Sequence, residues 1–171
     1  MPFVGSGLFL VEVAHQGKQA QSREAVDAVV AIARSLLQSG NTWTNANGQS
    51  RLMEPDDIHV VAPYNAQVSA LKRALLEMDV ARVGTVDKFQ GQEAPVVIYS
   101  CTSSSSESAP RGMAFLYDPH RFKVATNRAR STVIVVASPE LLEPDCRTPQ
   151  QMGRANGFCR FAELAMRVLM L

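Results

Sequence analysis

The sequence predicts an α/β fold with a mostly parallel sheet, and two patterns carry that prediction. Several short segments are apolar almost from end to end, as strands are when helices cover both faces of their sheet. Segments with apolar residues at helical spacing alternate with them, which is typical of parallel strands joined by helices. The chain has 171 residues, of which 46% are hydrophobic. This is enough for a core, and we predict a single domain over residues 1–171.

The expected elements follow this alternation along the chain. Residues 8–13 form a predicted strand, and Ser22 is a good N-cap for a helix that Gly40 ends. The polar segment 41–55, with its Asn-Gly pair, is predicted to be a loop, and the serine-rich segment 102–111 a mobile one. Further strands are expected at 58–62, 80–86, 95–101 and 132–137, and helices over 68–78, from Asp118-Pro119 onward and, as a last amphipathic helix, over 149–171.

Composition excludes several classes of protein. Seventeen basic and sixteen acidic side chains give a net charge of +1, which excludes nucleic-acid binding by bulk basicity alone. The charge is uneven, because residues 1–109 hold eight basic and eleven acidic side chains and residues 110–171 hold nine and five. No apolar run approaches the ~20 residues of a membrane span, and no signal peptide opens the chain. Three cysteines without C-x-x-C spacing and three dispersed histidines predict reduced thiols, a cytoplasmic location and no dedicated metal site.

Three polar segments follow predicted strands, and ligands of parallel sheets gather beyond the carboxyl ends of the strands. In the first, Pro63 and Tyr64 suit contact with a sugar–phosphate chain or stacking on a base, or they form a proline-shaped helix entry with a packed ring. The second, residues 84–93, crowds hydrogen-bonding side chains and two glycines between strands. That composition suits a ligand-binding loop, although an ordinary connection is also compatible with it.

The third segment, residues 118–130, is rich in arginine. Helical spacing places Arg121 and Arg128 on one face, with Arg130 at the helix end. Guanidinium groups are planar forked donors that suit phosphate oxygens. A solvated basic face is the alternative for these residues.

Together the three segments resemble motifs IV, V and VI of superfamily 1 helicases, in the group that includes the nonsense-mediated-decay helicase. The matching strings are VVAPYNAQV, GTVDKFQGQE and RFKVATNRAR, and the resemblance spans Leu8 to Ala137. Two positions depart from the family pattern: Lys123 stands where asparagine is usual, and Asn127 where threonine or serine is usual. The string SPELLEPDCRTPQQM further resembles bacterial proteins that fuse a RecB-type nuclease to such a helicase.

This resemblance implies a RecA-like P-loop NTPase fold and the second motor domain of an ATP-dependent DNA or RNA helicase. Arg128 matches the arginine finger that reaches the γ-phosphate of ATP. Glu93, with Gly91 allowing close backbone approach, matches the residue that contacts the ribose. Gln90 matches a position between the nucleotide and nucleic-acid surfaces.

The strand-binding residues come from the same resemblance. Thr85 and the pair Pro63-Tyr64 match positions that touch single-stranded DNA or RNA. Whether the strand is DNA or RNA is left open by these residues.

A phosphate-cradling loop, G-x-x-x-x-G-K-[ST], is missing from this sequence. The pair Gly17-Lys18 is followed by Gln19, and Glu12 stands where the first glycine belongs. We therefore expect that Met1 begins a fragment of a longer protein, that an N-terminal RecA-like domain of the same polypeptide holds most of the ATP and its Mg²⁺, and that the isolated chain does not hydrolyse ATP. The alternatives are a RecA-like docking module for nucleic acid or protein, and an unrelated nucleotide enzyme, which the lack of G-x-G-x-x-G and G-x-S-x-G strings disfavours.

Overall fold

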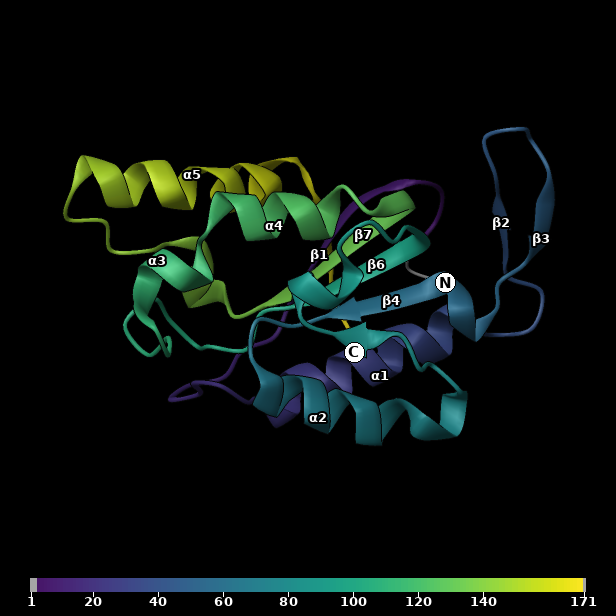
Figure 1. Ribbon diagram of the computed structural model, residues 1–171, viewed down its shortest axis with the longest axis horizontal. Helices are drawn as coiled ribbons and strands as arrows, with labels where there is room; N and C mark the ends of the chain where they lie inside the picture. The colour runs from purple at the N-terminus through teal and green to yellow at the C-terminus, as the bar shows by residue number, and fades with distance from the viewer. Residues whose placement is uncertain (1–2, 171) are drawn as a thin grey trace.

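The computed structural model describes residues 3–170, and across them the chain forms a six-stranded sheet with helices on both faces (Figure 1). Every neighbouring pair of strands in this sheet runs parallel. This confirms the predicted α/β class. The order is β5-β4-β6-β7-β1-β8, and the strands are β1 (Gly7–Glu12), β4 (Ile58–Val61), β5 (Val83–Gly84), β6 (Ala94–Ser100), β7 (Ala129–Ala137) and β8 (Met166–Val168).

The helices lie in two layers, one on each face of the sheet. Figure 1 shows α1 (Arg23–Leu36) and α2 (Asn65–Leu75) below the sheet, and α4 (Pro119–Thr126) and α5 (Pro149–Leu164) above it. The short helix α3 (Gly112–Leu116) lies at the end of the sheet toward which the strands point. The predicted cap of α1 is confirmed, because the Ser22 side chain accepts a hydrogen bond from the Ala25 amide at 3.1 Å.

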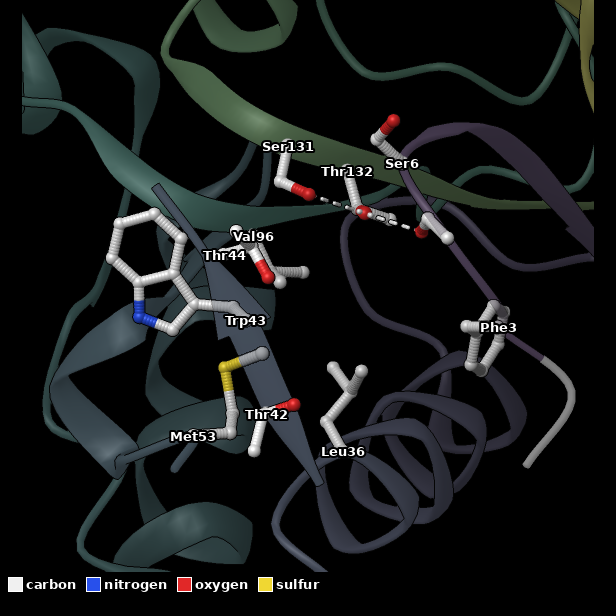
Figure 2. A pocket seen from close by; sticks show the side chains of 11 residues that line it. Phe3, Ser6, Leu36, Thr42, Trp43, Thr44, Met53, Val96, Ser131 and Thr132 are labelled. Atoms are coloured by element: carbon white, nitrogen blue, oxygen red, sulfur yellow. Dashed lines mark hydrogen bonds between the residues drawn. The ribbon is translucent and has the colours of Figure 1, made fainter. Parts of the chain in front are cut away.

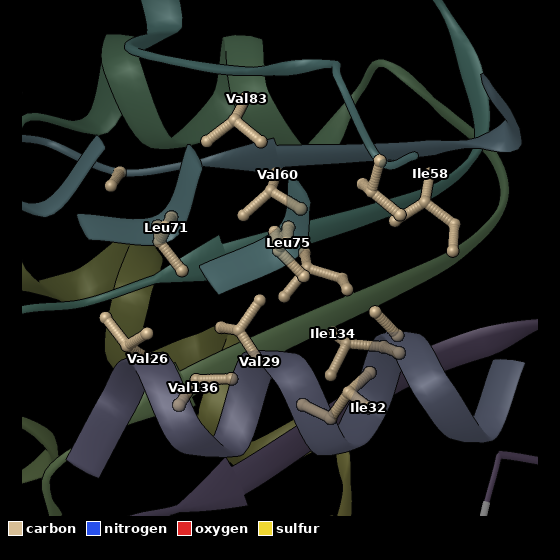
Figure 3. Close-up of a cluster of buried hydrophobic side chains, with 14 of the residues drawn as sticks. Val26, Val29, Ile32, Ile58, Val60, Leu71, Leu75, Val83, Ile134 and Val136 are labelled. Atoms are coloured by element: carbon tan, nitrogen blue, oxygen red, sulfur yellow. The ribbon is translucent and has the colours of Figure 1, made fainter. Parts of the chain in front are cut away.

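The α1–α2 side of the sheet holds one hydrophobic core. Val29 and Ile32 of α1 and Leu71 of α2 are fully buried, and they pack toward Val60 and Ile134 of the strands (Figure 3). These residues recur at helical spacing on the helices and come from one face of the strands, so the periodicity that predicts the elements also builds the core.

The α4–α5 side is held by aromatic side chains. The Phe122 ring of α4 meets Tyr99 of β6 edge to face, with ring centroids 5.6 Å apart. It also contacts Phe158 and Phe161 of α5, at 5.4 and 5.5 Å between centroids. This cluster fixes α4 against the sheet, and therefore fixes the arginine-rich segment that α4 carries.

Residues 41–55, predicted to be a loop, contain a β-hairpin instead. Its antiparallel strands are β2 (Thr42–Thr44) and β3 (Ser50–Leu52), and it projects from the sheet at the end opposite α3 (Figure 1). The Asn45 side chain accepts hydrogen bonds from the amides of Asn47 and Gln49 and so closes the turn. The strands are three residues each, which is too short for an alternating pattern to reveal them.

The last helix is shorter than predicted. Helix α5 ends at Leu164, Ala165 is extended, and Met166–Val168 form strand β8 beside β1, whereas the sequence predicts helix to residue 171. Leu171 itself lies outside the described residues. The edge of β1 offers backbone partners to this segment, and that long-range pairing overrides the local apolar spacing. Strand β5 is also shorter than the predicted 80–86.

The start of the serine-rich segment is packed, which corrects the prediction of a mobile loop. Ser103 and Ser104 are buried. The Ser103 hydroxyl donates to the carbonyl of Gln19, and the Ser104 hydroxyl accepts from the Lys18 amide. A loop far away in the sequence therefore holds this segment.

Within residues 3–170, no helix combines the length and the apolar character needed to span a membrane.

Candidate functional site

Most of the predicted site residues fall into two groups at opposite edges of the sheet, and Gln90 and Gly91 lie between them. Pro63 lies two residues after the carboxyl end of β4, and Thr85 directly follows the carboxyl end of β5. Glu93 directly precedes β6, and Arg128 directly precedes β7, so these two lie at the amino edge. The seven residues of β6 separate the edges by roughly 20 Å. The predicted site residues therefore do not all lie beyond the carboxyl ends of the strands, because Glu93 and Arg128 lie at the amino edge.

The topology explains this division. Strands β5 and β6 both run in the same direction as β4, so the segment that joins them must return from the carboxyl edge to the amino edge. Residues 84–93 make this return, with Thr85 at its start and Glu93 at its end. Helix α4 and the residues after it make a second return into β7. One continuous motif thus supplies residues to both edges.

At the amino edge, the ends of the two returns lie side by side. The Ala94 amide donates to the Arg128 carbonyl at 3.0 Å. The Arg130 side chain donates to the Glu93 carboxylate at 3.1 Å, and both of these side chains are exposed. The backbone bond therefore fixes Glu93 and Arg128 next to each other, on separate segments of the chain.

The Arg128 side chain is half-buried, and its guanidinium forms no ion pair with the described residues. Its Nε atom is buried without a hydrogen-bond partner among residues 3–170. Arg121 pairs with Asp87 and Asp118, and Arg130 pairs with Glu93, whereas no carboxylate of the described chain lies within ion-pair distance of Arg128. A buried donor without an acceptor is costly, so this guanidinium is suited to an anionic ligand.

Helix α4 does not carry Arg128, which corrects the predicted shared face with Arg121. The helix ends at Thr126 and Asn127 is its C-cap. Arg121 lies near the start of α4, toward the carboxyl edge, while Arg128 lies past its end. Arg130 belongs to β7 and not to a helix end. The three arginines therefore lie in different parts of the fold: Arg121 in α4, Arg128 after it and Arg130 in β7.

Gln90 and Gly91 lie between the two edges and are exposed. Gly91 has φ +82°, a left-handed conformation that side-chain-bearing residues rarely adopt, and open space lies where a Cβ would be. Gln90 lines a cavity of 250 Å³ with Asp87, Asp118 and Arg121. Gln90 is thus close to the start of α4, and Gly91 leaves the backbone at this point accessible to a ligand.

At the carboxyl edge, Pro63 and Tyr64 are buried. The Tyr64 hydroxyl donates to the carbonyl of Pro110 at 2.9 Å, and the ring packs near Phe115, with centroids 5.6 Å apart. This is the packed ring that the sequence left open as the alternative to base stacking. Stacking of a base on Tyr64 would require residues 110–115 to move.

Beside Tyr64 lies a cluster that the sequence reasoning did not identify. The guanidinium carbons of Arg111 and Arg121 each lie 4.5 Å from the centroid of the Phe115 ring. The four-residue spacing of Arg111 and Phe115 was the available signal, because residues so spaced meet on a helix. Arg111 has φ +64° and therefore sits in a strained backbone conformation.

The turn that begins after Thr85 connects the carboxyl edge to the core through Phe89. The Thr85 side chain is partly exposed and makes no capping hydrogen bond to the turn that follows it, residues Val86–Phe89. Phe89 of that turn is buried and stacks on the His59 ring of β4, with centroids 4.7 Å apart. Burial lowers the pKa of His59 to about 4, so this ring is neutral at pH 7.

The described residues offer no ready magnesium site. Within residues 3–170, no group of three or more histidine, cysteine, aspartate or glutamate side chains is placed to hold a metal ion. The acidic side chains at the candidate site are instead paired with arginine, as Glu93 is with Arg130 and Asp87 with Arg121.

Comparisons with known proteins agree with this architecture. Residues 10–140 match the model of a family described as an AAA domain. The chain is 38% identical to "Putative helicase mov-10-B.2" of Danio rerio over 125 residues, which cover 66% of this chain and 12% of that protein. It is 37% identical to "Helicase sen1" of Schizosaccharomyces pombe over 128 residues, 71% of this chain and 7% of that protein. It is 30% identical to "Putative regulator of nonsense transcripts 1" of Takifugu rubripes over 138 residues, 77% of this chain and 11% of that protein. The chain thus spans about a tenth of the length of these relatives.

Proposed function

Since this chain belongs to the AAA-domain family, with a RecA-like fold and as a superfamily 1 helicase domain of the nonsense-mediated-decay group, we propose that it is the second of two motor domains in an ATP-dependent helicase. In this proposal the domain supplies an arginine finger and strand contacts, and a preceding RecA-like domain of the same polypeptide holds most of the nucleotide. The strand is single-stranded DNA or RNA.

The uncommitted guanidinium of Arg128 is the observation that carries this proposal. Its Nε is buried without a partner in the described part of the chain, residues 3–170, and Arg128 lies at the edge where Glu93 also lies. Because no carboxylate of the described residues pairs with this guanidinium, its positive charge is available to bind a phosphate. Arg128 would therefore stabilise the negative charge that develops on the γ-phosphate, an effect worth about 10³–10⁵ in rate for arginine fingers.

Glu93 at the amino edge, and the residues just before it, would hold the nucleoside. The Glu93 carboxylate would accept hydrogen bonds from the ribose hydroxyls, with Gly91 allowing the backbone to approach and Gln90 lying toward the strand side. When bound, ATP supplies the phosphoryl group that is transferred to water. We assign the Mg²⁺ mainly to the other motor domain, because this sequence lacks the G-x-x-x-x-G-K-[ST] loop, whose serine or threonine hydroxyl binds the metal.

The carboxyl edge would contact the strand. The Thr85 hydroxyl is free of capping bonds and partly exposed, so it is available for a phosphate or sugar. Pro63 and Tyr64 would act through their backbone and by shaping the surface, because both side chains are buried. This mode of binding does not need a strongly basic domain, in agreement with the net charge of +1.

Arg128→Ala in the full-length protein tests the proposal. We expect turnover of ATP to fall by about 10³ or more, while binding of single-stranded nucleic acid stays within about twofold. Arg160→Ala is the matched control, because Arg160 lies exposed on α5 and pairs with Glu163. ATP turnover near the wild-type rate in Arg128→Ala would refute the finger assignment. Absence of a G-x-x-x-x-G-K-[ST] loop from the full-length protein would instead favour a non-catalytic docking module.

A further inference from the structure

The β2–β3 hairpin lies at the same sheet edge as Glu93 and Arg130, although it belongs to none of the three motifs. Its residues Trp43, Asn45 and Asn47 line a cavity of 580 Å³ together with Glu93 and Arg130. A ligand in this cavity can therefore reach both the Glu93 carboxylate and the hairpin.

The hairpin is fixed in this position, although a two-stranded ribbon alone is marginally stable. The Arg51 guanidinium donates to both carboxylate oxygens of Asp57, one of them at 2.7 Å, and Asp57 is buried. The same guanidinium lies over the Trp43 ring, 5.2 Å from its centroid. The bidentate bond and the ring contact together hold the hairpin as a rigid wall.

The cavity at Glu93 is suited to an uncharged ligand group. Glu93 and Arg130 neutralise each other at 3.1 Å, and Arg128, with its uncommitted charge, lines neither this cavity nor its neighbour. A triphosphate would therefore go to Arg128, and the ribose would go to Glu93. The rest of the nucleotide, its base, would extend toward the hairpin.

A second cavity of 260 Å³ adjoins the first and shares Ser6, Trp43, Thr44 and Ser131 with it. Figure 2 shows the Trp43 and Met53 side chains on one side of this cavity and Leu36, Val96 and Phe3 around the rest. Hydroxyl side chains line the same cavity, namely those of Ser6, Thr42, Thr44, Ser131 and Thr132. Sites for small ligands combine apolar and aromatic side chains with polar groups that fix the orientation of the ligand. We name this cavity the hairpin slot.

We infer that the hairpin slot binds the nucleobase of the nucleotide whose ribose Glu93 contacts. This inference rests on the proposed function, and it adds a base-binding surface contributed by a segment outside motifs IV, V and VI. Trp43 and Met53 would contact the base, and Ser131 at the rim would offer its hydroxyl as a hydrogen-bond partner.

Titrating the purified chain with ATP and, separately, with ribose 5-triphosphate tests the inference by NMR. Trp43 is the only tryptophan in the sequence, so its indole N–H gives a single signal. We expect both ligands to shift the Glu93 amide, and only ATP to shift the Trp43 indole and the Met53 methyl. The lack of a base makes ribose 5-triphosphate the discriminating probe.

A pair of methionine variants sharpens the test. Met53→Ala should weaken ATP binding about threefold to tenfold and leave ribose 5-triphosphate binding unchanged, because the base is the part of the nucleotide that Met53 would contact. Met152→Ala is the control, because Met152 is 58% exposed on α5. If both ligands shift Glu93 and neither shifts Trp43 or Met53, the slot inference is overturned while the nucleotide site stands. If neither ligand shifts Glu93, Trp43 or Met53, the slot inference is also overturned, whereas the proposed function still depends on Arg128→Ala in the full-length protein, because in that proposal the preceding domain holds most of the nucleotide.

Discussion

Acidification should destabilise this protein through His59, which joins the core to the segment between the two edges. The ring is 2% exposed and stacks on Phe89. Burial is the main cause of its lowered pKa of about 4, the positive charges of Arg82 and Lys88 add to it, and Asp56 opposes it. His59 thus stays neutral in the folded protein well below the pH at which an exposed histidine takes up a proton.

The size of the effect follows from the two pKa values. Between pH 6.5 and about 4 the unfolded chain binds a proton at this position and the folded chain does not, so stability falls as the pH falls through this range. A difference of about 2.5 pKa units corresponds to about 3 kcal/mol of unfolding free energy. The stability that depends on a neutral His59 is fully present above pH 6.5 and has been lost at about pH 4.

Urea unfolding of the wild type and of His59→Phe between pH 4 and 7 measures this effect. Phenylalanine keeps a ring against Phe89 and cannot be protonated, so the variant should lose about 3 kcal/mol less over the range. A smaller slope remains in the variant, because burial also lowers the pKa of His15. His120→Ala, which changes an exposed histidine, should keep the wild-type slope. Equal slopes in the wild type and His59→Phe would refute the reasoning.

Four further outcomes are expected. Gln67→Leu should lower the unfolding free energy by about 2 kcal/mol in urea, because it leaves the buried Ser22 amide, now bonded to Gln67 at 2.9 Å, without an acceptor and also removes the bond to Ser100. Ser22→Ala should lower it by about 1 kcal/mol through loss of the α1 cap, and Ser22→Asp should retain most of it. Tyr117→Phe should cost about 1 kcal/mol, because its hydroxyl donates to the Leu141 carbonyl at 2.7 Å; unchanged thermal unfolding would contradict this. The isolated chain should show no magnesium-dependent ATP hydrolysis above that of a mock purification, because its sequence lacks the phosphate-cradling loop.

Features decided by a few neighbouring residues were predictable from the sequence. The Ser22 cap of α1 and the start of α4, where Asp118 accepts from the His120 amide beside Pro119, are both confirmed. Both depend on side chains within one helical turn, so local rules suffice. The apolar strands were predictable for a similar reason, because burial on both faces leaves a continuous hydrophobic run.

Features decided by contacts across the chain were not predictable in the same way. Strand β8 forms because β1 offers it an edge, although more than 150 residues separate them. The burial of Tyr64 depends on Pro110 and Phe115, which no local pattern links to it. The hairpin owes its position to Asp57, whose carboxylate binds Arg51. Each is a tertiary contact that overrides or supplements local propensity.

The segment from Thr85 to Glu93 shows why the two edges must be considered together. It spans the sheet in a single connection, and it is fixed between its ends by the buried side chains of Val86 and Phe89. A displacement at Glu93 therefore reaches Thr85 through only eight peptide units, with His59 stacked against their middle. In a protein with the proposed function, this covalent path is the shortest one between the nucleotide edge and the strand edge. The parallel topology creates it, because every return between neighbouring strands must cross from one edge to the other.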